Sequence, residues 1–290
     1  MSHKPLCQLI GAGRAGRAIA GAMYRAGYRF TWICSRQSAN AKRLAYAVDC
    51  INYGTDFNNF KGYAGFLIIA VSDDQIARVA AEAVSAGIIG GESVAAHLSG
   101  ALGSDVLEPV RQAGASVMAF HPAQSFTYES DPNNVFRGIC FDMEGDDSAC
   151  ALGENIAHDL GAKPVRLTAD QRLISHLSMT VASNYTVTLF RMVEDIMKSA
   201  GISSETTIKL LMPLFSQTAV NIIESGTLKA LTGPAARGDS EIIRKHIAVL
   251  DTINIEYSSL YKLMAKIAVR MSVERGDIPR SKAEEILREL

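Results

Sequence analysis

The chain has 290 residues, of which 48% are hydrophobic, and a formal net charge of -1 at pH 7. A chain of this length exceeds the usual size of one domain, so we expect a domain of about 150 residues followed by a smaller one. The balanced charge excludes a general electrostatic attraction to nucleic acid or to an anionic membrane, and neither is an expected partner.

The N-terminal apolar stretch is too short for a secretory signal, and no segment reaches the ~20 apolar residues of a membrane helix. The five cysteines include no C-x-x-C pair and no His-flanked metal spacing: Cys7, Cys34, Cys50, Cys140 and Cys150. We therefore expect reduced, mostly buried thiols, no metal site and a cytoplasmic location.

Short apolar runs predict strands that end at Ile10, Cys34, Val71, Leu98 and Phe120. Between them, residues 15–26 and 74–86 have helical spacing of apolar side chains, and strands that alternate with helices indicate a parallel sheet between helical layers. The later runs GICFDM and KPVRLT flank another helical stretch and extend the predicted sheet to about Leu167.

Strand patterns stop after Leu167, and helices are predicted instead. Thr168 followed by Gln171 has the form of a capping box, and Gly201 is a plausible stop, so 169–200 is predicted as one long helix. Further helices are expected over 204–225 and 240–272 and in the final SKAEEILREL. We thus predict an α/β domain over 1–167 and an all-helical substrate and dimerisation domain over 168–290.

The sequence GAGRAG follows the first strand and opens a helix. In a dinucleotide site, Gly11 permits the tight turn, Gly13 lets the pyrophosphate approach the backbone, and Gly16 lets the helix pack on the strand. The amides at the helix start, at Arg14 and Ala15, are expected to bind the phosphates. The first domain is therefore predicted to be a doubly wound, Rossmann-type sheet that binds a dinucleotide.

The end of the second strand carries Ser35 and Arg36, where an NAD site usually has an acidic residue. A guanidinium and a hydroxyl bind a 2′-phosphate, so the expected cofactor is NADPH; the alternative is a solvated arginine. Four residues at the end of the third strand are expected at the same edge, where they contact the cofactor or cap the next helix: Val71, Ser72, Asp73 and Asp74.

Two histidines stand where parallel strands end, which is where ligands bind in open α/β sheets. His97 is at least as well explained by partners within the fold. His121 precedes Pro122, which stiffens the loop, and is expected to face the nicotinamide or the substrate.

The predicted long helix carries His176, Thr180 and Asn184 at positions i, i+4 and i+8, with Ser183 and Thr188 nearby. This spacing places them on one face of a helix that is otherwise rich in Leu, Val and Met. A solvent-facing side normally carries Lys and Glu, so the short neutral groups favour the wall of a cleft.

Together the segments GAGRAG, HLSGALGSDVL, FHPAQSF, ISHLSMTVASNY and LTGPAARGD resemble the Rossmann-like proteins with a DUF2520 C-terminal domain. These belong to the wider group of ketopantoate reductases, pyrroline-5-carboxylate reductases and 6-phosphogluconate dehydrogenases. Ketopantoate reductases have a catalytic lysine on the interdomain helix and an asparagine two turns later. The resemblance implies that His176 and Asn184 occupy these positions, and that His121-Pro122 is similar to the His-Pro pair of prephenate dehydrogenases.

The segment LTGPAARGD supplies further candidates for the substrate site. Arg237 is suited to bidentate capture of a carboxylate, and Asn221 is expected to orient the same ligand. Asp239 either contacts the substrate or caps the helix that starts at Ser240. Ser99, in the segment after His97, is a further candidate for substrate contact.

These observations predict an NADPH-dependent reductase of a small 2-oxo acid, with ketopantoate as the leading candidate. His176 is the expected proton donor, Asn184 polarises the carbonyl and Arg237 holds the carboxylate. The alternatives are an imine reductase or prephenate-type dehydrogenase on the same fold, and a protein that senses NADPH without turnover. The polar helix face argues against a sensor, and the apolar helical domain suggests a homodimer.

Overall fold

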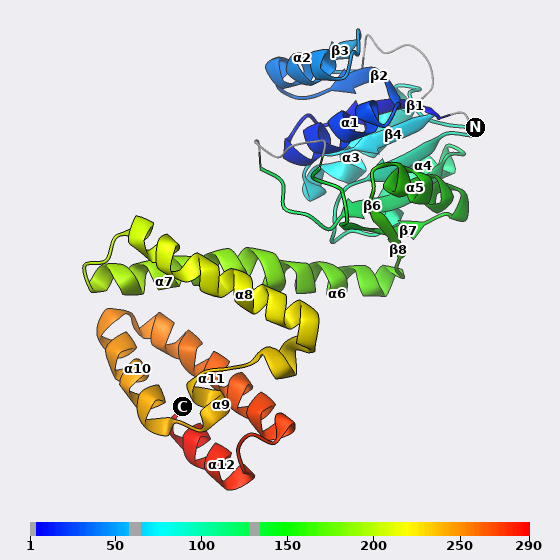
Figure 1. Cartoon of the computed structure of the whole chain (residues 1–290). Helices are drawn as coiled ribbons and strands as arrows, with labels where there is room; N and C mark the ends of the chain where they lie inside the picture. The colour runs from blue at the N-terminus through cyan, green and yellow to red at the C-terminus, as the bar shows by residue number, and fades with distance from the viewer. Residues whose placement is uncertain (1–3, 58–64, 128–133) are drawn as a thin grey trace. The chain divides into compact units, whose positions relative to one another are not determined.

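The computed structural model describes residues 4–57, 65–127 and 134–290. The chain divides into two compact units, residues 1–184 and 185–290. The first unit is an α/β domain and the second is entirely helical (Figure 1). The division falls inside the helical region that begins at Ala169, so the first helix of this region belongs with the sheet. The functional division into a cofactor domain and a substrate domain stays a prediction.

The first unit is built on an eight-stranded sheet with the order β3-β2-β1-β4-β5-β6-β7-β8. Its strands are β1 (Leu6–Ile10), β2 (Arg29–Cys34), β3 (Tyr53–Gly54), β4 (Phe66–Ile69), β5 (Val94–His97), β6 (Ser116–Pro122), β7 (Cys140–Gly145) and β8 (Lys163–Arg166). Seven of these strands match the apolar runs of the sequence. The two-residue β3 is too short to leave such a signal. The chain leaves the sheet in opposite directions from β1 and β4, which creates the crevice where such sheets bind ligands.

One pair of strands departs from the predicted parallel sheet. β6 and β7 are antiparallel, with His121 opposite Asp142, whereas all other neighbouring strands are parallel. A parallel connection needs a crossover, usually a helix, and the described residues between Pro122 and Cys140 form no helix. The chain instead returns alongside β6, where the Ala123 amide donates a 2.9 Å hydrogen bond to the Cys140 carbonyl.

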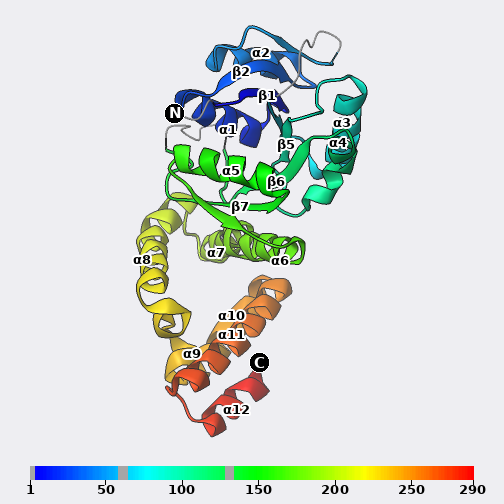
Figure 2. The same ribbon diagram turned by 90° about the vertical axis from the view of Figure 1, so that its right-hand side faces the viewer.

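Helices cover both faces of this sheet. They are α1 (Arg14–Arg25), α2 (Ser38–Ala47), α3 (Asp73–Ser85), a 3-10 turn η1 (Ser104–Leu107), α4 (Glu108–Gln112) and α5 (Asp147–Asp159). Figure 2 shows α1 and α5 on one side of the sheet and α3 and α4 on the other. Each face has its own buried apolar cluster, around Ile19 and Phe120 on the first side and around Ile76 and Val117 on the second. Burial on both faces explains why the strands read as continuous apolar runs.

The predicted long helix over 169–200 is interrupted. α6 (Ala169–Met179) begins with the predicted capping box, in which Thr168 and Gln171 exchange side-chain and backbone hydrogen bonds. A π turn, η2 (Thr180–Asn184), follows and leads into α7 (Tyr185–Ser199). Because a π turn closes hydrogen bonds five residues apart, it shifts the helical register that a strict four-residue spacing assumes.

The second unit contains α7, α8 (Ser204–Ala230), α9 (Pro234–Arg237), α10 (Ser240–Ile253), α11 (Ile255–Arg275) and α12 (Arg280–Glu289). The prediction of one helix over 240–272 is wrong, because Asn254 adopts an extended conformation and separates α10 from α11. Its side chain accepts a 2.8 Å hydrogen bond from the Glu256 amide and so caps α11. An asparagine cap of this kind ends one helix and starts the next without the glycine or proline that would signal a break in the sequence.

The buried core of the second unit lies among its last four helices, around Ile243, Val269 and Ile286. α7 has no buried residue, and in α8 only Thr207 is buried. Large apolar side chains on these two helices are instead exposed, for example Val187 at 69%. Within the described residues, no helix is both long enough and apolar enough to cross a membrane.

Candidate cofactor site and histidine site

The three glycines of the first loop differ in what surrounds them. A Cβ on Gly11, which has φ +108°, would lie 2.2 Å from the Ala70 carbonyl oxygen, and one on Gly16 would lie 1.9 Å from the Gly11 carbonyl oxygen. Both positions therefore require glycine for packing. A Cβ on Gly13 would meet nothing within 4 Å. Gly13 therefore leaves open space beside the loop backbone. No side chain caps the helix that follows.

A cavity of about 800 Å³ opens at this loop, at the carboxyl ends of β1, β2 and β4. Its lining includes six predicted cofactor residues: Gly11, Gly13, Ser35, Arg36, Val71 and Ser72. Arg14, Ala15, Gly16 and Asp73 are outside the lining, although Arg14 and Ala15 form the first turn of α1 and Asp73 begins α3. The cavity therefore brings together the glycine loop and the end of β2.

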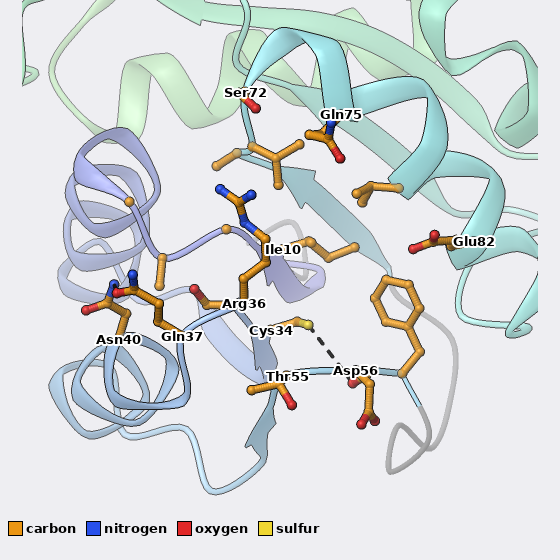
Figure 3. Close-up of a pocket in the computed structure, with 18 of the residues that line it drawn as sticks. Ile10, Cys34, Arg36, Gln37, Asn40, Thr55, Asp56, Ser72, Gln75 and Glu82 are labelled. Carbon is orange, nitrogen blue, oxygen red and sulfur yellow. Dashed lines mark hydrogen bonds between the residues drawn. The ribbon is translucent and has the colours of Figure 1, made fainter.

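Arg36 extends from the end of β2 across this cavity toward the segment that contains Ser72 (Figure 3). Nearby Asn40 and Thr55 add neutral polar groups to the lining. At the floor of the cavity, burial raises the pKa of the Cys34 thiol to about 11, with a smaller contribution from Asp56. Cys34 is therefore a neutral thiol here, and Arg36 brings positive charge to the cavity.

Ser72 lies at the start of α3, where the sequence left open whether it caps the helix or contacts the cofactor. Ser72 occupies the N-cap position, but its side chain does not cap the helix. Hydrogen bonds from Ser72 and Gln75 lower the pKa of the exposed Asp74 carboxyl, and the charge of Arg36 contributes less. Because Ser72 lines the cavity and makes no cap, its cofactor role stays a prediction.

A second polar cluster lies in the same unit, at the end of β6. His121 is largely buried, and its Nδ1 is 2.8 Å from Oδ2 of Asp142 on the antiparallel strand β7. The other carboxylate oxygen, Oδ1, accepts a 2.6 Å hydrogen bond from Nη1 of Arg172 on α6. Arg172 is fully buried and Asp142 is 4% exposed, so this is an ion pair inside the protein.

The remaining donors of Arg172 bind a tight turn that follows β5. Its Nη2 donates to the Ser99 carbonyl at 2.6 Å, and its Nε donates to the Leu102 carbonyl at 3.0 Å. The Ser99 hydroxyl accepts hydrogen bonds from the amides of Ala101 and Leu102, each at 3.2 Å. Ser99 therefore shapes the turn with its side chain, and its predicted contact with substrate stays a prediction.

His176 meets His121 over the same turn. The two rings lie edge to face, with centroids 6.0 Å apart. A Cβ on the buried Gly100 would lie 2.5 Å from Nδ1 of His176 and 2.9 Å from Nε2 of His121. Both histidines thus pack on the bare side of Gly100. Nδ1 of His176 is buried and has no hydrogen-bond partner among the described residues.

His97 is accounted for within the fold, as the alternative interpretation held. Its Nδ1 accepts a 3.2 Å hydrogen bond from the Ser99 amide, and its Nε2 donates a 3.0 Å hydrogen bond to the Gly103 carbonyl. The ring is fully buried, and this burial lowers its pKa to about 4. His97 is therefore a neutral residue that supports the Ser99 turn.

The predicted helix face that carries His176 is altered by the π turn. Thr180 begins the turn and is half-buried, whereas Asn184 ends it and is exposed. The expected alignment of His176, Thr180 and Asn184 assumed an uninterrupted α-helix, and the π turn changes that spacing, so their shared face stays a prediction. π turns nevertheless recur at functional sites.

The candidates of the second unit have separate surroundings. Asn221 is half-buried, and its side chain accepts a hydrogen bond from Gln217 one turn away. Arg237 is exposed at the end of α9. Asp239 caps α10, because its carboxylate accepts a hydrogen bond from the Ile242 amide. The capping alternative for Asp239 is thus confirmed, and contact of these three residues with a substrate stays a prediction.

Sequence reasoning missed Asp142, Arg172 and Gly100. A signal for Asp142 existed, because an aspartate inside the apolar run GICFDM must find a partner if it is buried. The pairing with Arg172 joins residues 30 positions apart and had no local signal. Among the described residues, no group of three or more His, Cys, Asp or Glu side chains is arranged to hold a metal ion.

Comparison with known proteins finds two family models along the chain. Residues 5–122 match the family model of the Rossmann-like domain, and residues 139–268 match that of DUF2520, a domain of unknown function. The chain therefore consists of a Rossmann-like domain followed by a DUF2520 domain. No curated protein matches the sequence.

Solved structures show the same arrangement. A "putative NADP oxidoreductase" from Bacteroides fragilis is 26% identical, with a TM-score of 0.78 over 92% of this chain and 98% of that one. A pyrroline-5-carboxylate reductase from Coxiella burnetii is 17% identical, with a TM-score of 0.58 over 94% and 98%. An imine reductase from Aspergillus terreus in complex with NADPH4 is 16% identical, with a TM-score of 0.61 over 97% and 99%. At 16% and 17% identity, the last two establish the fold alone.

Proposed function

We propose that the protein is an NADPH-dependent oxidoreductase that reduces a small 2-oxo acid, with ketopantoate as the leading candidate. The observation that carries this proposal is the cavity at the ends of β1, β2 and β4. It combines a glycine loop that is open at Gly13 with the cation of Arg36. Its volume of about 800 Å³ lies in the usual range of cofactor and ligand pockets.

The residues of the cavity fit a dinucleotide phosphate. The Gly13 position leaves room for a pyrophosphate at the start of α1, and as the N-cap residue it makes no side-chain hydrogen bond to the helix. Ser35 and Arg36 supply the hydroxyl and the guanidinium that a 2′-phosphate requires. When bound, NADPH supplies the hydride for the reduction. The similarity to an NADP oxidoreductase of Bacteroides fragilis supports the same cofactor.

The reduction also needs a proton for the substrate oxygen, and the first unit holds two histidines side by side. His121 and His176 both pack on Gly100, and either can hold a transferable proton. We further propose that Ser99, Thr180 and Asn184 of the first unit contribute to substrate binding, with Asn184 polarising the carbonyl.

A cyclic imine is the second candidate substrate. The similarity to an imine reductase and a pyrroline-5-carboxylate reductase favours this possibility. The same histidines would serve, because a proton is then held toward the substrate nitrogen in place of an oxygen. A prephenate-type dehydrogenase is a further alternative on the same fold. The structure of this chain is also similar to that of an arogenate dehydrogenase from Synechocystis.

The test is a screen of NADPH oxidation across 2-oxo acids, beginning with ketopantoate, and across cyclic imines. Binding of NADPH and NADH is measured in parallel by fluorescence titration. Turnover with one class of substrate identifies the reaction. Tight NADPH binding without turnover on either class would favour a protein that senses NADPH, and failure of NADPH to bind would reject the proposal.

We also propose that the protein acts as a homodimer in the cytoplasm. α7 and α8 expose large apolar side chains, among them Val187, Leu214 and Ile223, which is 81% exposed. Several large apolar side chains exposed on two helices favour burial in a protein–protein interface. The five free thiols, four of them buried, suit a reducing compartment. Light scattering coupled to gel filtration tests the dimer, and a mass of 31.2 kDa, that of one chain, would reject it.

A further inference from the structure

The reversal of β7 places a carboxylate directly across from His121. In the antiparallel register, His121 pairs with Asp142, and the ring nitrogen Nδ1 lies 2.8 Å from Oδ2. Oδ1 of the same carboxylate is bound by Arg172, whose other donors bind the Ser99 and Leu102 carbonyls. Arg172 is thus held by two backbone carbonyls and in turn holds the Asp142 carboxylate, so that Oδ2 is fixed beside the imidazole of His121.

This contact determines which nitrogen of a neutral His121 carries the proton. A carboxylate only accepts hydrogen bonds, so Nδ1 must be protonated to bond with Asp142. Nε2 is then free of a proton and lies on the side of Gly100 and His176. When the ring gains a second proton, it does so at Nε2, while Nδ1–H keeps its acceptor.

His176 has the opposite properties. Its Nδ1 is buried against Gly100 and lacks a hydrogen-bond partner among the described residues. The positively charged ring carries a proton on both nitrogens, and a buried N–H without an acceptor is unfavourable. The neutral ring with its proton on Nε2 avoids this loss. Of the two histidines, only His121 has a partner that suits the charged form.

We propose that His121 carries the transferable proton at Nε2, that Asp142 and Arg172 are its positioning residues, and that His176 is a neutral neighbour. This inference deepens the proposed function and rests on it for the reaction. It assigns the proton to His121 in place of the sequence-based choice of His176.

The step balances as a simple proton transfer. The charged ring of His121 gives its Nε2 proton to the substrate oxygen, or to the nitrogen of an imine, as that atom gains the electron pair of the double bond. The ring is left neutral with Nδ1–H still bonded to Asp142, and a proton from solvent restores it. The titratable or charged groups that face His121 in the described structure are Asp142, His176 and, beyond the carboxylate, Arg172.

The first test needs no substrate. Ring nitrogens of ¹⁵N-labelled protein are observed by NMR at a pH where the histidines are neutral, with assignments from His121→Gln and His176→Gln. His121 is expected to carry its proton on Nδ1, while His97 and His176 carry theirs on Nε2. A proton on Nε2 of neutral His121 would overturn the proposal. The tautomer itself is measured on the wild-type protein, and the two variants serve only to assign its signals.

Asp142→Asn tests the positioning role. Arg172 requires an acceptor, so the asparagine oxygen is expected to face Arg172 and its NH₂ group to face His121. An NH₂ group donates, and neutral His121 should therefore move its proton from Nδ1 to Nε2. Asp159→Asn is the matched control, because Asp159 also pairs with two side chains, which are Lys4 and Tyr28 and not His121 or Arg172. A folded Asp142→Asn protein with an unchanged His121 tautomer would overturn the role of Asp142.

Kinetics then separate this inference from the proposed function. On a substrate found in the screen, His121→Gln should lower kcat about a hundredfold or more and leave NADPH affinity unchanged, whereas His176→Gln should lower kcat less. In Asp142→Asn, the alkaline limb of the pH profile of kcat should move to lower pH, with kcat affected more than KM. The reverse order of the two histidine variants would overturn the proposal even if the enzyme is a reductase. The expected tautomers in a protein without turnover would retain the positioning pair and reject the reductase.

Discussion

The neutral, buried His97 makes the first unit sensitive to acid. Burial lowers the pKa of this ring to about 4, whereas an exposed histidine titrates near 6.5. Because the pKa of His97 is lower in the folded protein, between about pH 4 and pH 6.5 the unfolded chain binds a proton at this residue and the folded chain does not. The free energy of unfolding should therefore be intact above about pH 6.5 and fall as the pH drops toward 4.

The size of this effect follows from the two pKa values. A difference of about 2.5 units corresponds to roughly 3 kcal/mol, of which about 2 kcal/mol should be lost between pH 7 and pH 5. Solvent screens the charge of this ring little, because the ring is 0% exposed. Protonation of Nδ1 would also remove the acceptor of the Ser99 amide, and the turn that carries Gly100 would lose one of its supports.

The assay is urea unfolding followed by the fluorescence of Trp32, the single tryptophan, which is buried in the first unit. His97→Gln is the informative variant, since its NH₂ group can still donate to the Gly103 carbonyl but does not titrate. His158→Gln, which removes an exposed histidine, is the control. An equal loss of stability between pH 7 and pH 5 in His97→Gln and in the wild type would refute the reasoning.

Three further predictions test other parts of the chain. Gly13→Ala should leave the free energy of unfolding almost unchanged but weaken NADPH binding, whereas Gly16→Ala should destabilise the first unit because its methyl group meets the Gly11 carbonyl; urea unfolding and cofactor titration distinguish the two. Arg36→Ala should weaken NADPH binding about tenfold and leave NADH binding unchanged, and an unaltered preference would contradict the 2′-phosphate role. Asn254→Ala should cost about 1 kcal/mol in thermal unfolding followed by circular dichroism, through loss of the α11 cap.

Features encoded by neighbouring residues could be predicted from the sequence. The glycine spacing gave distinct roles to Gly11, Gly13 and Gly16, and the surroundings of each glycine agree with those roles. The capping box at Thr168 is likewise formed as predicted, and of the two roles left open for Asp239 the cap is formed. Each depends on contacts within a few residues, so the local pattern contains the necessary information.

Features that depend on distant pairing could not be predicted in this way. An apolar run indicates a buried strand but not its direction, so the reversal of β7 was missed. The helical pattern over 240–272 continues through Asn254, and only the extended backbone there shows the break. The π turn that begins at Thr180 likewise could not be predicted, because it alters the alignment of side chains along the helix without changing the apolar composition.

The direction of β7 also bears on the choice between the two histidines. If β7 ran parallel to β6, the register that sets Asp142 opposite His121 would not exist, and His176 on its polar helix would be the better-supported acid. With the observed reversal, the carboxylate faces His121, and Arg172 from α6 fills the other side of that carboxylate. The proposed assignment of the proton to His121 therefore depends on sheet topology, which brings the Asp142 carboxylate within hydrogen-bond distance of that ring.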